Sequence, residues 1–276
     1  MQSNETVDVT RAYYNSDDAD SFYATIWGGE DIHIGLYEES GESIFDASRR
    51  TVERMAGKVA DRLPGARILD LGAGYGGSAR YLASRFPDCH VDCLNLSEVQ
   101  NERNRKLNAE QGLADRIGVI DGSFEDVPAE DGGYDLVWSQ DAFLHSGDRS
   151  RVLREVDRVL KQNGTLIFTD PMQKEEVQPD EIRPVLDRIH LETMGSIPFY
   201  KRELEALGFQ VEDVEELTHQ LVRHYSSVRQ QIVAHDDALA RTCSRDYIER
   251  MKAGLQHWVD AGQAGKLEWG ILVFVR

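Results

Sequence analysis

The stretch Asp70-Leu71-Gly72-Ala73-Gly74-Tyr75-Gly76-Gly77 decides the fold, because it lies where a short apolar run meets a helical pattern. The run 68–71 predicts a buried strand, and the apolar spacing over 78–85 predicts a helix. Glycines at such a junction let the backbone turn tightly and let a ligand touch the main chain. The stretch therefore predicts a strand, a glycine-rich binding loop and a helix.

The alternation of strands and helices continues towards the C-terminus. Apolar runs at 91–96, 117–120, 134–138 and 165–169 predict further strands, and 98–111 and 149–162 have the spacing of helices. Two more predicted strands, 209–217 and 267–275, flank a helical stretch that runs through residue 257. Such alternation is typical of a parallel sheet covered on both faces. We therefore expect an α/β, Rossmann-like fold with a seven-stranded, mostly parallel sheet and helices on both faces.

Two segments outside this alternation complete the predicted organisation. Residues 1–65 contain a helical pattern at 46–62 and an aromatic-rich stretch from Tyr13 to Trp27. We expect a helical N-terminal arm whose aromatic part is a lid that orders over a bound ligand and excludes water; packing on the sheet for stability is the alternative. Residues 66–276 then form the main domain, with a substrate-covering insertion at about 172–200 that contains a helix at 182–190.

Charge and hydropathy exclude several classes of function. The chain has 49 acidic and 31 basic residues, so its net charge is −18. Nucleic acids and anionic membranes attract basic surfaces, so neither is expected as a partner. The sequence has no run of about eighteen apolar residues and no signal-like start, so we expect a cytoplasmic protein.

The cysteines and the acidic residues also indicate the environment. Cys89, Cys93 and Cys243 have no zinc-site spacing, so we expect reduced, partly buried thiols and no metal. The acidic residues are dispersed along the chain, as on a solvated surface whose repulsion is relieved by salt. This pattern favours a salt-tolerant source organism.

Gly72, Gly74 and Gly77 have the G-x-G-x-x-G spacing of dinucleotide-binding proteins. Two other features of the loops nevertheless indicate S-adenosylmethionine rather than a dinucleotide. Asp70 places a carboxylate before the glycines, where it can meet the ammonium group of the cofactor's amino acid moiety. The second strand ends on Asn95, where a ribose-binding acid is the commonest residue. Asn95 can still bond a ribose hydroxyl, and an NAD-dependent oxidoreductase is the alternative from a different class.

A third loop follows the third predicted strand, where Ser123 beside Phe124 suits the edge and face of an adenine ring. The three loops fall at the carboxyl ends of strands, where open α/β sheets bind ligands. Over residues 65–172 they resemble the class I methyltransferases. The resemblance implies S-adenosylmethionine as cofactor, S-adenosylhomocysteine as its product, and a cofactor site formed by Asp70, Gly72, Gly74, Asn95, Leu96, Gln100, Ser123, Phe124 and Gln140.

Motifs outside these loops are more specific. They are WGGEDIHIGLY at 27–37, WSQDAFLHS at 138–146, TDPM at 169–172, LDRI at 186–189, GLQHW at 254–258 and GKLEWG at 265–270. Through them, nearly the whole chain resembles the sarcosine/dimethylglycine N-methyltransferases. The resemblance implies methyl transfer to the nitrogen of sarcosine and dimethylglycine, yielding the osmolyte glycine betaine, and it fits the acidic surface. The alternatives are a methyltransferase for another small amine, such as phosphoethanolamine, and a non-catalytic ligand-binding relative.

His145 is the expected catalytic base. It lies in the loop after the fourth predicted strand, and the ordinary pKa of histidine near neutrality suits a general base. Capping of the next helix, or bonding to a main-chain carbonyl, is the structural alternative. Similar loops occur in phosphoethanolamine methyltransferases, in which a lid tyrosine pairs with the matching histidine. This resemblance implies Tyr14 as the partner of His145, with Tyr13 as the alternative.

The acceptor's carboxylate needs a cation, and Arg188 on the expected insertion has the forked geometry that suits it. An exposed helix arginine paired with a neighbouring acid is the alternative. Trp27 is expected to offer a ring face to the methylated ammonium. Asp141 and Met172, from the motifs quoted above, complete the predicted substrate site. The expected partner is a small soluble amine, and the expected oligomeric state is a monomer or a homodimer.

Overall fold

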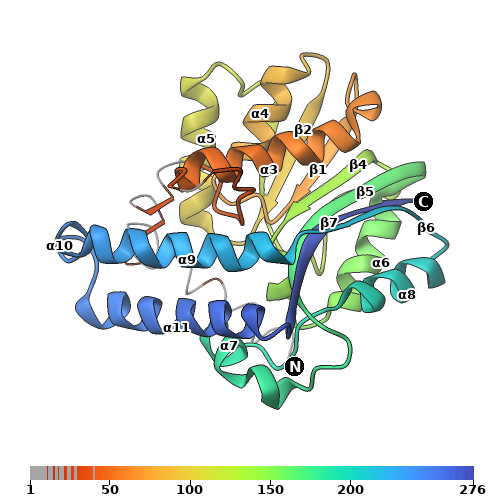
Figure 1. The fold of residues 1–276 in the computed structure, drawn as a ribbon. Coiled ribbons are helices and arrows are strands. Elements are labelled where there is room, and N and C mark those ends of the chain that lie inside the picture. The colour runs from red at the N-terminus through yellow and green to blue at the C-terminus, as the bar shows by residue number, and fades with distance from the viewer. Residues whose placement is uncertain are drawn as a thin grey trace.

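A seven-stranded sheet forms the centre of the protein (Figure 1). The computed structural model describes residues 11, 15, 18, 22, 23, 26, 27, 30–39 and 41–276. The strands are β1 (Arg67–Leu71), β2 (His90–Asn95), β3 (Ile117–Asp121), β4 (Tyr134–Gln140), β5 (Leu160–Gln173), β6 (Gln210–Glu216) and β7 (Leu267–Val275). Their order is β3-β2-β1-β4-β5-β7-β6; the pairings among β1 to β5 are parallel, and β7 is antiparallel to β5 and β6. The expected mostly parallel, Rossmann-like sheet is confirmed.

Helices cover both faces of this sheet, as expected (Figure 1). On one face lie α3 (Ile44–Lys58), α4 (Gly77–Arg85) and α5 (Glu98–Glu110), and on the other lie α6 (Arg149–Val159) and α8 (Ile197–Ala206). Side chains alternate along each strand, so Ile68 packs with the α3 and α4 side chains while Leu69 and Leu71 pack with those of α6.

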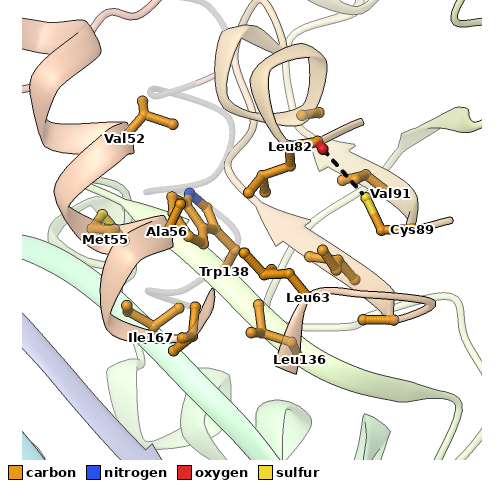
Figure 2. Packing of buried hydrophobic residues seen from close by; sticks show 14 of the residues in the cluster. Val52, Met55, Ala56, Leu63, Leu82, Cys89, Val91, Leu136, Trp138 and Ile167 are labelled. Atoms are coloured by element: carbon orange, nitrogen blue, oxygen red, sulfur yellow. Dashed lines mark hydrogen bonds between the residues drawn. The ribbon is translucent and has the colours of Figure 1, made fainter. Parts of the chain in front are cut away.

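The core between α3, α4 and the sheet holds the strands that carry the site (Figure 2). Val52 and Met55 of α3 and Leu82 of α4 are fully buried there, against Trp138 of β4. Each such side chain contributes roughly 1.5–3 kcal/mol when it is buried. This packing fixes β1 and β4, and with them the loops at their carboxyl ends.

The boundary between α6 and β5 differs from the expectation. The helix expected over 149–162 ends at Val159, and β5 begins at Leu160, which is fully buried and pairs with Tyr134. The pair Asn163-Gly164 lies within β5, where the register shifts before Thr165. Asn163 has a φ of +63°, a left-handed conformation that asparagine tolerates at a bulge.

The long helical stretch before β7 is a hairpin rather than one helix. In Figure 1, α9 (Thr218–Ala234) and α11 (Arg245–Gln263) lie side by side, joined through the short α10 (Asp236–Leu239). From the expected insertion, the 3-10 turn Pro179–Ile182 leads into α7 (Arg183–Arg188), which packs against α11. Within the aromatic-rich stretch from Tyr13 to Trp27, the described aromatic residues Phe22, Tyr23 and Trp27 are buried against this hairpin.

Other observations bear on location and metal binding. Across the described ranges, the structure contains no helix long and apolar enough to cross a membrane. In the same part of the chain, no group of three or more His, Cys, Asp and Glu side chains is arranged to hold a metal ion. Cys89, Cys93 and Cys243 are buried and form no disulfide.

Candidate active site

Two adjoining cavities lie at the carboxyl ends of the parallel strands. The first, which we call the cofactor cavity, is lined by the loops that follow β1, β2, β3 and β4. The second, the acceptor cavity, is lined by the N-terminal arm, the 3-10 turn Phe143–His145, α7, α9 and α11. Ile32, Asp141 and His145 line both cavities, so ligands in the two cavities would meet at these side chains.

The glycine loop shapes the cofactor cavity by backbone geometry. Gly72 has a φ of +80°, and a Cβ there would lie 2.4 Å from Cβ of Ala142. The main-chain N–H of Gly72 donates to the carbonyl of Leu94, which joins the loop to β2. An L side chain at 72 would be strained and would collide with the wall, so glycine is required there.

All but one of the predicted cofactor residues line the cofactor cavity. They are Gly72, Gly74, Asn95, Leu96, Gln100, Ser123, Phe124 and Gln140. Asn95 donates from Nδ2 to Oε1 of Gln100 at 3.0 Å, and Phe124 meets Phe143 edge to face. The cavity is also lined by residues to which the sequence analysis assigned no role: Arg11, Ile32, Ser97, Gly122, Glu125 and Ala142. Of these, Ile32 and Ala142 lie in the quoted motifs at 27–37 and 138–146.

Gln140 has one polar atom available for a ligand. Its Oε1 accepts hydrogen bonds from Oγ of Ser78 at 2.5 Å and from Nε1 of Trp138 at 3.0 Å, which fixes the orientation of the amide. Its Nε2 is buried and has no hydrogen-bond partner among the described residues. A buried N–H in this position is expected to find an acceptor, which a ligand in the cavity would supply.

Asp70 is the predicted cofactor residue that does not line the cavity. It lies at the end of β1, just before the glycine loop, and is 3% exposed. Burial raises the pKa of its carboxyl to about 7; His33 opposes the rise and the Asp31 carboxylate adds to it. A cation bound near the loop would stabilise the ionised form, so the proton occupancy of Asp70 depends on the ligand.

His145 lies at the junction of the two cavities. Burial, aided by the positive charge of Arg188, lowers the pKa of its imidazole to about 4. The ring is therefore neutral at physiological pH and a weaker base than a free histidine. Tyr14 and Tyr13, its expected partners, lie outside the described residues.

Arg188 lies in the wall of the acceptor cavity and is not an exposed helix arginine. It is the last residue of α7, and its side chain crosses α11 at Gly254, where a Cβ would lie 2.2 Å from Cδ of Arg188. Its guanidinium also contacts Sδ of Met251 at 3.5 Å. The absence of a side chain at Gly254 therefore gives the arginine its path into the cavity.

Trp27 lines the acceptor cavity as expected. Its ring lies 5.0 Å from that of Tyr23 and 5.5 Å from that of His224, between centroids. Its Nε1–H donates to the carbonyl of His33 at 3.4 Å, so its polar edge is directed to the main chain. The aromatic faces then form an apolar part of the wall.

Asp141 lines both cavities, but its two oxygens hold the structure together. Oδ2 accepts from the main-chain N–H of Ile34 at 2.6 Å, and Oδ1 accepts from Nε1 of Trp269 at 2.8 Å. Its φ of +51° is uncommon outside glycine, and residues held in that region often lie at functional sites. Burial also raises the pKa of its carboxyl. The residue therefore joins the N-terminal arm to β7.

Met172 is a correction to the predicted substrate site. It is fully buried in the core beneath the sheet, with Phe168 and Tyr200, and lines neither cavity. Its neighbour Pro171 lines the acceptor cavity instead. The reason is the strand period, since successive side chains of β5 point to opposite faces.

The aromatic side chains of the acceptor cavity that were not predicted from the sequence include His33, His224, Tyr225 and Trp258. His33 lies in a quoted motif that carried no chemical assignment. The others come from α9 and α11, where apolar spacing indicates a helix but not a ligand site. These side chains line one cavity because α9 and α11 form a hairpin, and no local sequence pattern predicts that hairpin.

This fold and site define a protein of the class I methyltransferase type, and the family model for the methyltransferase domain matches residues 69–168. The chain is 56% identical to a sarcosine/dimethylglycine N-methyltransferase of Halorhodospira halochloris, over 98% of this chain and 97% of that one. It is 55% identical to that of Aphanothece halophytica, over 95% and 94%. A solved structure from Galdieria sulphuraria, proposed to be a sarcosine dimethylglycine methyltransferase, matches with a TM-score of 0.91 and 45% identity, over 95% and 98%. The chain belongs to the sarcosine/dimethylglycine N-methyltransferase family, which does not support the oxidoreductase alternative.

Proposed function

We propose that this protein transfers methyl groups from S-adenosylmethionine to the nitrogen of sarcosine and dimethylglycine, yielding glycine betaine. The observation that carries the proposal is the meeting of two cavities at Asp141 and His145. The names of the relatives at 56% and 55% identity support the choice of acceptors. We also infer a cytoplasmic enzyme, a monomer or homodimer, that acts on a small soluble amine.

The cofactor cavity fits S-adenosylmethionine in its polar and its apolar parts. Gln140 Nε2, unpartnered within the described part of the chain, suits the carboxylate of the cofactor's amino acid moiety. Asp70 lies behind the glycine loop and does not line the cavity, but its carboxylate, stabilised by a bound cation, would provide negative charge near the ammonium group. Asn95 suits the ribose and Phe124 the adenine. When bound, this cofactor supplies an electrophilic methyl group.

The acceptor cavity suits a small zwitterion. Arg188 provides the positive charge for a carboxylate, in a chain whose net charge is −18. The rings of Trp27 and Tyr23 provide an apolar wall for N-methyl groups, each of which gains about 0.8 kcal/mol on burial. Glycine would forgo that gain, so we expect it to be a poor acceptor.

The acceptor nitrogen must lose a proton before it attacks, and His145 suits this task as a neutral group. An imidazolium would repel the ammonium, whereas the neutral ring accepts a hydrogen bond or the proton from it. A carboxylate bound beside Arg188 offsets the charge that contributes to the low pKa of His145. The acceptor therefore makes His145 a stronger base when it binds. Alignment in a water-poor cavity supplies the rest of the rate enhancement.

Two measurements test the proposal. Calorimetry is expected to detect binding of S-adenosylhomocysteine and none of NAD. A radiolabelled methyl-transfer panel is expected to label sarcosine and dimethylglycine, and to label glycine, phosphoethanolamine and a tocopherol weakly or not at all. Transfer to phosphoethanolamine or the tocopherol alone would refute the acceptor assignment, and binding of NAD alone would refute the cofactor assignment.

A further inference from the structure

His224 has a hydrogen-bonding pattern that fixes which ring nitrogen carries its proton. It lies in α9, is 1% exposed and lines the acceptor cavity. Its Nδ1 is 3.2 Å from the main-chain nitrogen of Gly35 and 3.0 Å from the hydroxyl of Tyr37. Because a main-chain N–H can only donate, Nδ1 is an acceptor, and the neutral ring carries its proton on Nε2.

The neutral form of His224 persists over the physiological range. Burial, aided by the nearby His33, lowers the pKa of the His224 imidazole to about 3. The other titratable or charged side chains that line the cavity are Tyr23, His33, Asp141, His145, Arg188, His190 and Tyr225, and Tyr37 lies against the Nδ1 edge of His224. The Nε2–H group is therefore a permanent, uncharged donor.

This donor faces the acceptor cavity without a partner in the described ranges. Nε2 of His224 is buried and unbonded there, and so is Nε1 of Trp258, which lines the same cavity. The Nδ1 edge of His224 is turned to Gly35 and Tyr37, which do not line the cavity, so the Nε2 edge borders it. Buried N–H groups are rarely left unbonded in native proteins, so two of them in one cavity indicate a ligand with acceptor oxygens.

The two N–H groups share a wall with Arg188. Trp258 follows Gly254 by one helical turn, so it lies on the face of α11 that Arg188 crosses. The ring of Tyr225 connects His224 and Trp258, at centroid distances of 5.5 Å and 5.1 Å. Among the described side chains that line the cavity, Arg188 is the one lysine or arginine. One full positive charge with two neutral donors suits a monoanion better than a doubly charged phosphate.

We propose that His224 is a specificity-determining residue that donates from Nε2 to the acceptor's carboxylate, with Trp258 Nε1 as a second donor beside Arg188. The proposal rests on the proposed function, and it adds the residues that select a carboxylate. The carboxylate then lies against α9 and α11, and the methylated nitrogen lies towards Trp27 and His145.

Two substitutions at His224 separate its two nitrogens. His224→Asn keeps an acceptor oxygen near the Nδ1 position and removes the donor at Nε2, whereas His224→Gln places an amide N–H near Nε2. His235→Asn is the matched control, because His235 is exposed just after the C-terminal end of the same helix and lines neither cavity. Steady-state kinetics with dimethylglycine, calorimetry with S-adenosylhomocysteine and thermal unfolding are measured for each variant.

His224→Asn is expected to raise KM for dimethylglycine by about 10- to 100-fold, the usual effect of one hydrogen bond to a charged group. Its kcat and its affinity for S-adenosylhomocysteine should stay within roughly threefold of the parent, since the bond forms equally in ground and transition states. His224→Gln should recover part of the lost affinity. Binding of N,N-dimethylethanolamine, which has no carboxylate, should be equal in parent and His224→Asn.

An unchanged KM in a folded His224→Asn protein overturns the proposal, as does an equal loss of affinity for N,N-dimethylethanolamine. If His224→Asn does not fold, Trp258→Phe tests the same pair of donors: a raised KM at normal cofactor affinity supports the proposal, and an unchanged KM overturns it. A parent that methylates neither sarcosine nor dimethylglycine overturns the proposed function itself. The parent's activity thus distinguishes the two failures.

Discussion

Gly254 offers a way to move Arg188 without changing its charge. A Cβ at position 254 would lie 2.2 Å from Cδ and 2.6 Å from Nε of Arg188. Contacts this short force one partner to shift, and the arginine side chain is flexible whereas the backbone of α11 is not. Gly254→Ala is therefore expected to fold normally and to turn Arg188 out of the acceptor cavity.

The size of the effect follows from the bond that is lost. A charge-assisted pair with a carboxylate contributes roughly 1.5–3 kcal/mol, which corresponds to about a 10- to 100-fold rise in KM for dimethylglycine. Alanine is about 1 kcal/mol better than glycine inside a helix, so the melting temperature should not fall. Affinity for S-adenosylhomocysteine should be unchanged, because Gly254 does not line the cofactor cavity.

Gly57→Ala in α3 is the matched control, since a Cβ there has no atom within 4 Å. It should stabilise the protein by up to about 1 kcal/mol and leave KM unaltered. Steady-state kinetics and thermal unfolding check both variants. A KM within about twofold of the parent for Gly254→Ala, at a normal melting temperature, would refute the assignment of Arg188 to the carboxylate.

Three further changes test the cofactor cavity and the base. Asp70→Asn should weaken S-adenosylhomocysteine binding by about 1–3 kcal/mol in calorimetry. In the parent, the affinity for S-adenosylhomocysteine should fall as the pH drops through about 7, because the Asp70 carboxyl then takes up a proton. The variant should lose this pH dependence. His145→Ala should lower kcat by about 10²- to 10⁴-fold near neutral pH and recover partly in alkaline buffer, which supplies the free amine; an unchanged rate would leave His145 structural. Gly72→Ala should weaken cofactor binding at least about tenfold, because its Cβ would lie 2.4 Å from Cβ of Ala142 and the residue would have to adopt a φ of +80°. An unaltered cofactor affinity would refute the role of this turn.

The cofactor cavity could be predicted because its chemistry is local. Glycines at a strand–helix junction, Asn95 at the end of β2 and Ser123 after β3 each occupy a position that the strand–loop–helix repeat determines. Parallel strands then bring these loops to one edge of the sheet. Knowing the strand ends is therefore enough to place the loops together.

The acceptor cavity could be predicted only in part, because it depends on contacts between distant segments. Arg188 had two interpretations until its path across Gly254 was known. His224 and Trp258 have the apolar neighbours of ordinary amphipathic helices, and their shared wall exists because α9 and α11 fold into a hairpin. The prediction that Met172 belongs to the substrate site was wrong for a related reason, since the sequence does not reveal which face of β5 borders the cavity.

The position of β7 has a consequence for how this protein is made. The strand is last in the chain, yet it lies between β5 and β6, so neither can complete its pairing until residues 267–275 are present. Trp269 of β7 donates a hydrogen bond to Asp141, which lies 128 positions away in the sequence. Asp141 in turn accepts a hydrogen bond from the main chain of Ile34, 107 positions away. Such long-range closure slows folding, because loop entropy is lost before the contacts form. A nascent chain can therefore form the glycine loop early, whereas the junction at Asp141 forms only after Trp269 has left the ribosome.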